Sequence, residues 1–402
     1  MAGDIVRHSE AVVRLLKQFP CVVVLGARQV GKTTLVKKLL PKAPFFDLEK
    51  TSDFLMIDGD PEFFLKQYKQ PIVIDEAQLC PRLFKALRVR IDEDRKKKGR
   101  FLISGSSSPE LLNEISESLA GRVGIYELGP LIISEIQERK VGPFFHYLAK
   151  KKYNQLADLS PQGELDVVEA CMMGGYPEPF LLKKQVERKL WFENYISTYI
   201  DRDIRRLFPD LQMETYRRFI QMLALCPAQI VNQSLLASSL GVSPPTVARY
   251  IDIAQGTYLY RTWPAFSSGD QSKKYVRNSK GAFRDTGLLC HFFRIQNKED
   301  YLGHPQAGPI FETWGIETII RSFNALQVVF DYSFVRTKNQ AEIDLILNGE
   351  MGLIPIEIKL GSSVRRENLP FLKEFIKERN CPIGIIINNS DRTEFLADKV
   401  LQ

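Results

Sequence analysis

The segment from Cys21 to Thr34 constrains the fold more than any other part of the sequence. An apolar run, Cys21–Leu25, is followed at once by the complete G-x-x-x-x-G-K-T pattern, written here as Gly26-Ala27-Arg28-Gln29-Val30-Gly31-Lys32-Thr33 and followed by Thr34. The pattern stands directly after a predicted strand and directly before a predicted helix, as a phosphate-binding loop requires. The two glycines let successive backbone N–H groups point at phosphate oxygens, and the helix adds its positive N-terminal end.

Two acidic residues complete the nucleotide site that this loop predicts. Lys32 is expected to bridge the β- and γ-phosphates, and the Thr33 hydroxyl is expected to bind Mg²⁺. About forty residues further on, the apolar run Ile72–Asp75 ends in Asp75 and Glu76. Asp75 is expected to hold Mg²⁺ through its waters, and Glu76 to act as general base on the attacking water. The predicted ligands are therefore ATP and Mg²⁺.

Two further residues are candidates for sensing or stabilising the γ-phosphate. Ser104 ends the strand Phe101–Ser104, where a hydroxyl could contact the phosphate or water, although a helix-capping role is nearly as good an interpretation. Arg122 stands at the entrance of the strand Val123–Glu127 and could reach a γ-phosphate in its own or a neighbouring subunit. A surface salt bridge explains Arg122 equally well.

The order of apolar runs indicates the fold class. Five strand-like runs in the first third alternate with amphipathic segments, which is typical of a parallel α/β sheet covered on both sides. Helical periodicity dominates as far as Leu225, in segments such as Glu187–Asp203. We therefore expect an AAA-like P-loop ATPase domain at 1–137, a helical region at 138–230, a winged-helix-like region at 231–300 and a nuclease-like domain at 301–402.

Composition excludes some alternatives. The chain has 402 residues, 44% of them hydrophobic and 26% charged, as in an ordinary globular protein. It shows neither a secretion signal nor an apolar run of about 18 residues, so a cytoplasmic protein with no membrane partner is expected. The six cysteines have no metal-ligand spacing and are expected to be buried thiols. The net charge of +7 allows a polyanionic partner without requiring one.

Residues Val231–Ile251 predict a helix, a turn at Gly241 and a second helix capped by Ser243. Candidate strands at Tyr258–Phe266 and Lys274–Arg277 would follow as a wing. DNA phosphates could be contacted by the basic residues Arg249, Lys273, Lys274 and Arg277. The second helix offers one basic residue and no cluster that reads base edges, so a protein-packing or oligomerisation module is at least as good an interpretation.

The C-terminal part resembles the core of PD-(D/E)xK nucleases in Ala341–Leu347 and Leu353–Lys359. That resemblance implies that Asp344 and Glu357 hold a second divalent metal, and that Lys359 positions or activates the attacking water. Glu317 on the preceding helix could add a ligand. The fold order helix–strand–strand–strand–helix–strand agrees with this resemblance, whereas Ile343 replaces the usual Pro.

The order of motifs along the whole chain resembles AAA-type prokaryotic ATPases with a C-terminal DUF4143 region. Besides the segments above, the resemblance rests on Leu119–Arg122, Leu128–Leu131 with Glu135, Gly174–Glu178, Tyr199–Ile204, Lys274 with Tyr275, Asp285–Gly287, and Phe311 with Glu312. It implies an ATPase but names no substrate. The leading hypothesis is that ATP binding and hydrolysis are coupled to domain motion on a DNA or protein partner, with a homo-oligomer as one option. The alternatives are a nucleotide-gated switch with slow turnover and an ATP-controlled DNA nuclease.

Overall fold

The computed structural model describes residues 5, 7–106, 115, 117–160, 166–267, 276, 278–364 and 369–402, apart from the side chain of Asp201. The chain divides into two compact units, each considered by itself below. The first comprises residues 1–131 and 251–259, and the second comprises residues 132–250 and 260–402. The division into four domains expected from the sequence stays a prediction.

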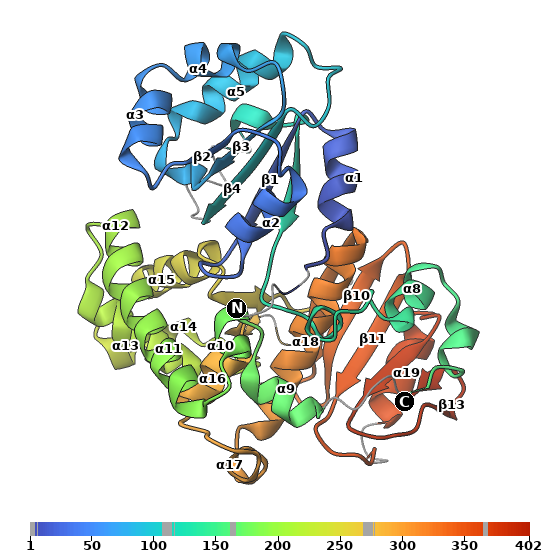
Figure 1. Cartoon of the computed structure of the whole chain (residues 1–402). Coiled ribbons are helices and arrows are strands. Elements are labelled where there is room, and N and C mark those ends of the chain that lie inside the picture. The colour runs from blue at the N-terminus through green and yellow to red at the C-terminus, as the bar shows by residue number, and fades with distance from the viewer. Residues whose placement is uncertain are drawn as a thin grey trace. The chain divides into compact units, whose positions relative to one another are not determined.

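The first unit contains a five-stranded sheet in the order β2-β3-β4-β1-β5, and every strand pairs in parallel with its neighbour (Figure 1). Its strands are β1 (Cys21–Gly26), β2 (Phe45–Asp47), β3 (Ile72–Asp75), β4 (Phe101–Ser106) and β5 (Val123–Glu127). Its helices are α1 (Glu10–Gln18), α2 (Lys32–Leu39), α3 (Thr51–Gly59), α4 (Pro61–Gln67), η1 (Ala77–Leu79) and α5 (Arg82–Asp92). The parallel α/β sheet predicted from the alternating pattern is confirmed.

The central strands of this sheet are apolar because both of their faces are covered. All six residues of β1 are buried, as are all four of β3. Their side chains share a core with α5, whose buried residues Leu83, Phe84 and Leu87 recur at helical spacing. A run without polar alternation therefore marks a strand between two helix layers.

The second unit begins with helices and a small antiparallel sheet. The helices are α7 (Ile133–Ile136), α8 (Pro143–Ala149), η2 (Tyr153–Leu156), α9 (Val167–Met173), α10 (Pro177–Leu181), α11 (Gln185–Thr198), η3 (Tyr199–Ile204), α12 (Arg205–Leu207), α13 (Met213–Ala224), α14 (Gln233–Leu240), α15 (Pro244–Gly256), α16 (Thr286–Phe292) and α17 (Lys298–Gly303). Helix α15 crosses the division between the two units. The expected helix Glu187–Asp203 changes after Thr198 to the π-helical segment η3.

The small sheet has the order β6-β8-β7, formed by β6 (Gln229–Ile230), β7 (Tyr260–Trp263) and β8 (Lys280–Phe283). Of the candidate strand expected at Lys274–Arg277, only Val276 lies within the described residues, so that expectation stays a prediction; β8 begins at Lys280. Lys273, Lys274 and Arg277 lie outside the described residues.

A mixed six-stranded sheet ends the second unit, in the order β13-β14-β12-β11-β10-β9 (Figure 1). It contains β9 (Phe330–Arg336), β10 (Glu342–Gly349), β11 (Gly352–Ile358), β12 (Gly384–Ile387), β13 (Phe395–Ala397) and β14 (Val400–Leu401). Helix α18 (Ala307–Leu326) shares one core cluster with this sheet, and α19 (Leu369–Glu378) shares another. Strands β13 and β14 were not predicted, because two- or three-residue strands give little periodic signal.

Among the described helices, none combines the length and the apolar character needed to cross a lipid bilayer. All six cysteines are free, and five are buried as expected. Cys226 differs, since it is exposed at the end of α13.

Two motifs that are distant in the sequence form one hydrogen-bonded unit. Asp285 caps α16 by accepting from Leu288 N at 3.0 Å, and it also accepts from Gly175 N at 2.7 Å. Gly174 has φ +68° and ψ −155°, and a Cβ there would lie under 3.0 Å from the Asp285 carboxylate. Gly174 and Asp285 therefore serve packing, because that backbone region is essentially restricted to glycine.

We predict that Gly174→Ala destabilises the protein more than Gly241→Ala. Gly241 has the same φ of +68°, but a Cβ there would meet nothing within 4 Å. Alanine at Gly241 should cost about 1 kcal/mol through left-handed backbone strain alone. At Gly174 the clash with Asp285 adds to the strain, so a loss of about 3 kcal/mol is expected. Urea unfolding of both variants checks this, and equal midpoints would contradict the structural role of Gly174.

Candidate functional site

The loop between β1 and α2 is folded as a phosphate cradle. Gly31, which precedes α2, has φ +91°, and Gln29 has φ +63°. A Cβ at Gly26 would lie well under 3.0 Å from the carbonyl oxygen of Leu128. Both glycines are therefore required by the backbone itself, one for its left-handed dihedral angle and the other for close approach.

Lys32 lies folded against the loop that carries it. Its ammonium group donates to the carbonyl oxygens of Gly26 at 3.1 Å and Ala27 at 2.9 Å, and to Ser106 Oγ at 3.3 Å. Burial lowers the pKa of Lys32, against the opposing effect of Glu76 and Asp75. The ammonium is thus held at the mouth of the loop by neutral acceptors, which an anionic phosphate would outcompete.

Thr33 and Asp75 meet as the sequence predicted. Thr33 Oγ1 donates to Asp75 Oδ2 at 2.6 Å, and Asp75 is 2% exposed. Ser104 Oγ and the backbone N–H of Glu76 donate to the other carboxylate oxygen, Oδ1, at 2.5 and 3.1 Å. A hydroxyl and a carboxylate are the hard oxygen donors that Mg²⁺ takes, so the donor set fits that ion.

Glu76 is held in an unusual conformation beside this pair. Its φ of +55° and ψ of +41° are left-handed, a conformation that tends to accumulate at functional sites. Its carboxylate accepts from the Gln78 side chain, and Ser106 Oγ lies 3.5 Å from Oε1. The side chain is therefore oriented by groups on two different elements.

Ser106, rather than Ser104, lies beside both Lys32 and Glu76. The sequence prediction chose Ser104 because β4 was expected to end there, whereas the strand continues to Ser106, opposite Gly26 of β1. Ser104 is buried and engaged by Asp75. Side chains two residues apart share a face of a strand, so the correct strand length would have identified Ser106.

Arg122 does not reach the nucleotide loop of its own chain. The pairing of Cys21 with Val123 places Arg122 at the edge where β1 begins, whereas the loop follows Gly26 at the other edge. Five residues of strand separate these levels, roughly 16 Å. The guanidinium instead donates to Asp92 at 2.7 and 2.8 Å. The expectation of a contact in cis was therefore wrong, and a contact from a neighbouring subunit stays a prediction.

Arg7 was missed by sequence reasoning. Its guanidinium donates to the carbonyl oxygens of Val30 at 2.9 Å and Gly129 at 2.7 Å. Arg7 thereby ties the phosphate loop to the segment that follows β5. An arginine that precedes the motif by about twenty residues carries no local signal of this role.

A second cluster of charged groups lies in the second unit, where Asp344, Glu357 and Lys359 come together as predicted. Lys359 Nζ is 3.3 Å from Asp344 Oδ2 and 2.7 Å from Glu357 Oε1. Asp344 also accepts from Ile358 N at 2.8 Å. The pairing of β10 with β9 shifts register between Ile343 and Ile346, and such irregularities are common where a side chain is re-aimed.

Glu317 is not part of this cluster, contrary to expectation. It lies among the guanidinium groups of Arg261 at 2.5 Å, Arg284 at 3.7 Å and Arg321 at 3.6 Å. Glu312, five residues earlier on α18, is the glutamate of this helix that lies beside Asp344. Five residues turn a helix by about 140° beyond a full circle, so the two side chains leave it on different faces.

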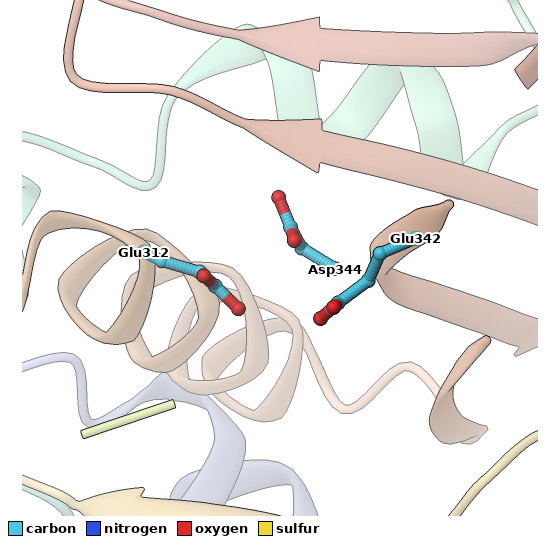
Figure 2. A group of neighbouring side chains, drawn as sticks. All are labelled: Glu312, Glu342 and Asp344. Atoms are coloured by element: carbon cyan, nitrogen blue, oxygen red, sulfur yellow. The ribbon is translucent and has the colours of Figure 1, made fainter. Parts of the chain in front are cut away.

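Glu312, Glu342 and Asp344 face one another across the gap between α18 and β10, and their donor atoms all lie within 4.8 Å (Figure 2). Lys280 of β8 donates to Glu312 at 2.6 Å and also to Glu342. Burial, and secondly the charge of Asp344, raise the pKa of Glu312 to about 8 and that of Glu357 to about 8. Glu342 and Lys280 were missed by sequence reasoning, because no motif or spacing singles them out.

Some solved structures resemble the chain at low similarity. A Walker-type ATPase of Pyrococcus abyssi has 13% identity and a TM-score of 0.45, covering 72% of this chain and 95% of that one. The RuvB Holliday junction branch migration motor of Thermotoga maritima has 15% identity and a TM-score of 0.30, covering 64% and 89%. Similarities at this level carry no conclusion about activity.

Matches in sequence are more informative. The family model described as AAA domain matches residues 18–137, and two models described as domains of unknown function, DUF8612 and DUF4143, match residues 164–299 and 307–402. Uncharacterized proteins of Mycobacterium tuberculosis and Mycobacterium bovis are each 31% identical over 347 residues, which is 85% of this chain and 71% of theirs. The chain therefore belongs to the AAA-type ATPases that carry a C-terminal DUF4143 region.

Proposed function

We propose that the chain hydrolyses ATP with Mg²⁺ at the end of β1 and β3, and that this cycle drives domain motion on a partner. The observation that carries the proposal is the hydrogen-bonded series in which Ser106 joins Lys32 to Glu76, next to the Thr33–Asp75 pair. A cation for phosphate, oxygen donors for the metal and a carboxylate base thus share one edge of the sheet.

Each side chain then has a distinct task. Lys32 would exchange its bonds with the Gly26 and Ala27 carbonyls for bonds with the β- and γ-phosphates. Thr33 and Asp75 would hold Mg²⁺, which neutralises phosphate charge when bound. Glu76 would accept a proton from the attacking water, since Gln78 and Ser106 already fix its direction. Ser104 would act indirectly, as a positioning residue that orients Asp75.

The order of elements in the second unit supports a winged-helix-like module as the partner-binding part. Helix α13 is followed by β6, α14, α15, β7 and β8, and the three strands form one antiparallel sheet. Arg249 is exposed on α15, the second helix of the predicted pair. One arginine suits phosphate contact better than base reading, so DNA and protein remain alternative partners. A slow nucleotide-gated switch would use the same module.

A second candidate activity is metal-dependent cleavage of DNA in the C-terminal region. It is favoured by the assembly of Asp344, Glu357 and Lys359 at 2.7 to 3.3 Å. Incubation of plasmid DNA with the protein and Mn²⁺, with and without ATP, tests this activity. Intact plasmid in both reactions, or equal nicking by Glu357→Gln, would eliminate it.

We predict that Glu76→Gln lowers the rate of ATP hydrolysis by about 10² to 10³-fold and leaves ATP binding within a few-fold of wild type, because glutamine cannot accept the proton. Lys32→Ala should instead weaken binding itself, since a charged hydrogen bond to phosphate is lost. Phosphate release and calorimetric ATP titration separate the two effects. If Glu76→Gln turned over at the wild-type rate, Glu76 would not be the base.

We also predict that Ser106→Ala slows hydrolysis more than it weakens ATP binding, by about tenfold in rate, because its hydroxyl orients Lys32 and Glu76 together. Single-turnover hydrolysis at saturating ATP measures this effect. A variant that loses affinity but keeps the wild-type rate would show that Ser106 only shapes the binding pocket.

Arg7 supplies a test of how the loop is held. Arg7→Lys keeps the positive charge but replaces the two guanidinium nitrogens, which bond Val30 and Gly129 separately in a fixed planar geometry, with a single ammonium nitrogen, so ATP affinity should fall by roughly tenfold. The matched control is Arg14→Lys, at an exposed position of α1, which should bind ATP as wild type does. Unchanged affinity in Arg7→Lys would mean that the loop keeps its shape without this brace.

A further inference from the structure

Lys280 is a buried lysine whose position the proposed ATPase does not explain. It is 2% exposed, and its ammonium group lies 2.6 Å from Glu312 Oε1 while also donating to Glu342 Oε1. The ring of Phe334 lies 5.6 Å from the same nitrogen. Burying an ammonium is costly unless it is hydrogen-bonded or paired, and here both partners are carboxylates, so the two glutamates and the lysine form one electrostatic unit.

The same carboxylates would be obvious ligands for a divalent cation. The donor atoms of Glu312, Glu342 and Asp344 come within 4.8 Å of one another, and they project from α18 and β10 toward a common space (Figure 2). Such a set of hard oxygen atoms suits Mg²⁺ or Mn²⁺. The question is therefore whether that space is open to a metal.

The carboxylate oxygens of this cluster already form ion pairs with lysine and arginine side chains of the same chain. Lys280 contacts Glu312 and Glu342, and Lys359 contacts Asp344 at 3.3 Å and Glu357 at 2.7 Å. Arg336 Nε lies 3.4 Å from the second oxygen of Glu342. Each of the four carboxylates thus has a positively charged partner within the fold.

A divalent metal does not fit this arrangement. Its ligand oxygens would have to lie at about 2.0–2.2 Å, drawn from the groups that Lys280 now contacts. An ammonium group has no lone pair with which to coordinate a metal, and its charge would repel the incoming ion at short range. The acidic residues are suited to the metal, but Lys280 is not.

We propose that Lys280 is the resident cation of this cluster, so that its ammonium takes the place of a divalent metal and keeps a latent Mg²⁺ or Mn²⁺ site closed. The lysine comes from β8 of the three-stranded sheet, whereas Glu312 and Glu342 come from α18 and β10. The contact therefore also ties the small sheet to the C-terminal sheet. The inference concerns cation binding and does not depend on ATP hydrolysis, but it opposes the second candidate activity: while Lys280 occupies the cluster, metal-dependent cleavage of DNA through Asp344 is not expected.

Binding of Mn²⁺ alone, without nucleotide, tests the proposal. Every variant carries Asp75→Asn, which removes the carboxylate at the nucleotide site, and free Mn²⁺ is followed by electron paramagnetic resonance at pH 8. Adding Lys280→Met, which is similar in length but uncharged, should create one Mn²⁺ site at least tenfold tighter than any in the parent. Lys280→Arg, the matched control that retains the charge, should create none.

The new site must also depend on the acidic residues. Adding Asp344→Asn to Lys280→Met should abolish the gain in Mn²⁺ binding. A Lys280→Met protein that gains no Mn²⁺ site, or whose gain survives Asp344→Asn, would overturn the proposal.

The parent protein gives an independent test that does not require Lys280→Met to fold. With Lys280 in place, Glu312→Gln and Asp344→Asn should leave Mn²⁺ binding unchanged, because the proposal holds that these carboxylates bind no metal. If either change removed a Mn²⁺ site from the parent protein, a metal would bind beside Lys280 and the proposal would be wrong.

Discussion

The parallel pairing of β1 with β4 is the constraint on which the nucleotide site depends. This register sets Gly26 opposite Ser106 and Val24 opposite Ser104. It thereby brings the start of the phosphate loop level with the hydroxyl that contacts both Lys32 and Glu76. A shift of one residue would turn both serines to the other face of the sheet, and Asp75 would lose its hydroxyl donor. The chemistry of the loop therefore rests on backbone hydrogen bonds several residues away.

The sequence predicted those parts of the molecule that have a strong local signal. The phosphate loop, the five parallel strands and the meeting of Thr33 with Asp75 follow from a contiguous motif and from runs that are apolar on both faces. Asp344, Glu357 and Lys359 were grouped through the resemblance to PD-(D/E)xK nucleases, whose pattern is likewise read from two short contiguous segments. These features need only the neighbours along the chain to be recognised.

The remaining features depend on contacts between distant segments. Arg7 braces the loop from a position before the first helix, and Lys280 reaches Glu312 from a strand 32 residues away along the chain. Arg122 was placed correctly at the entrance of its strand, but in a parallel sheet that edge lies opposite the phosphate loop, so the option of a contact within its own chain failed. Glu317 was chosen over Glu312 although only one of two residues five apart on a helix can face a given strand.

The nucleotide site and the C-terminal acidic cluster differ in the groups that donate hydrogen bonds to their carboxylates. This difference decides which of the two can bind a metal ion. Asp75 is held by two hydroxyls and a backbone N–H, which are neutral and can remain in place when a cation arrives. Glu312 and Glu342 are held by the ammonium of Lys280, which competes with any cation for the same oxygens. Neutral donors leave the negative charge of Asp75 available, whereas a lysine cancels the charge of its partners. The C-terminal cluster has more carboxylates than the nucleotide site, and by that count alone it would be the better metal site. Because two of its carboxylates are paired with Lys280, the nucleotide site is the better candidate for binding a metal.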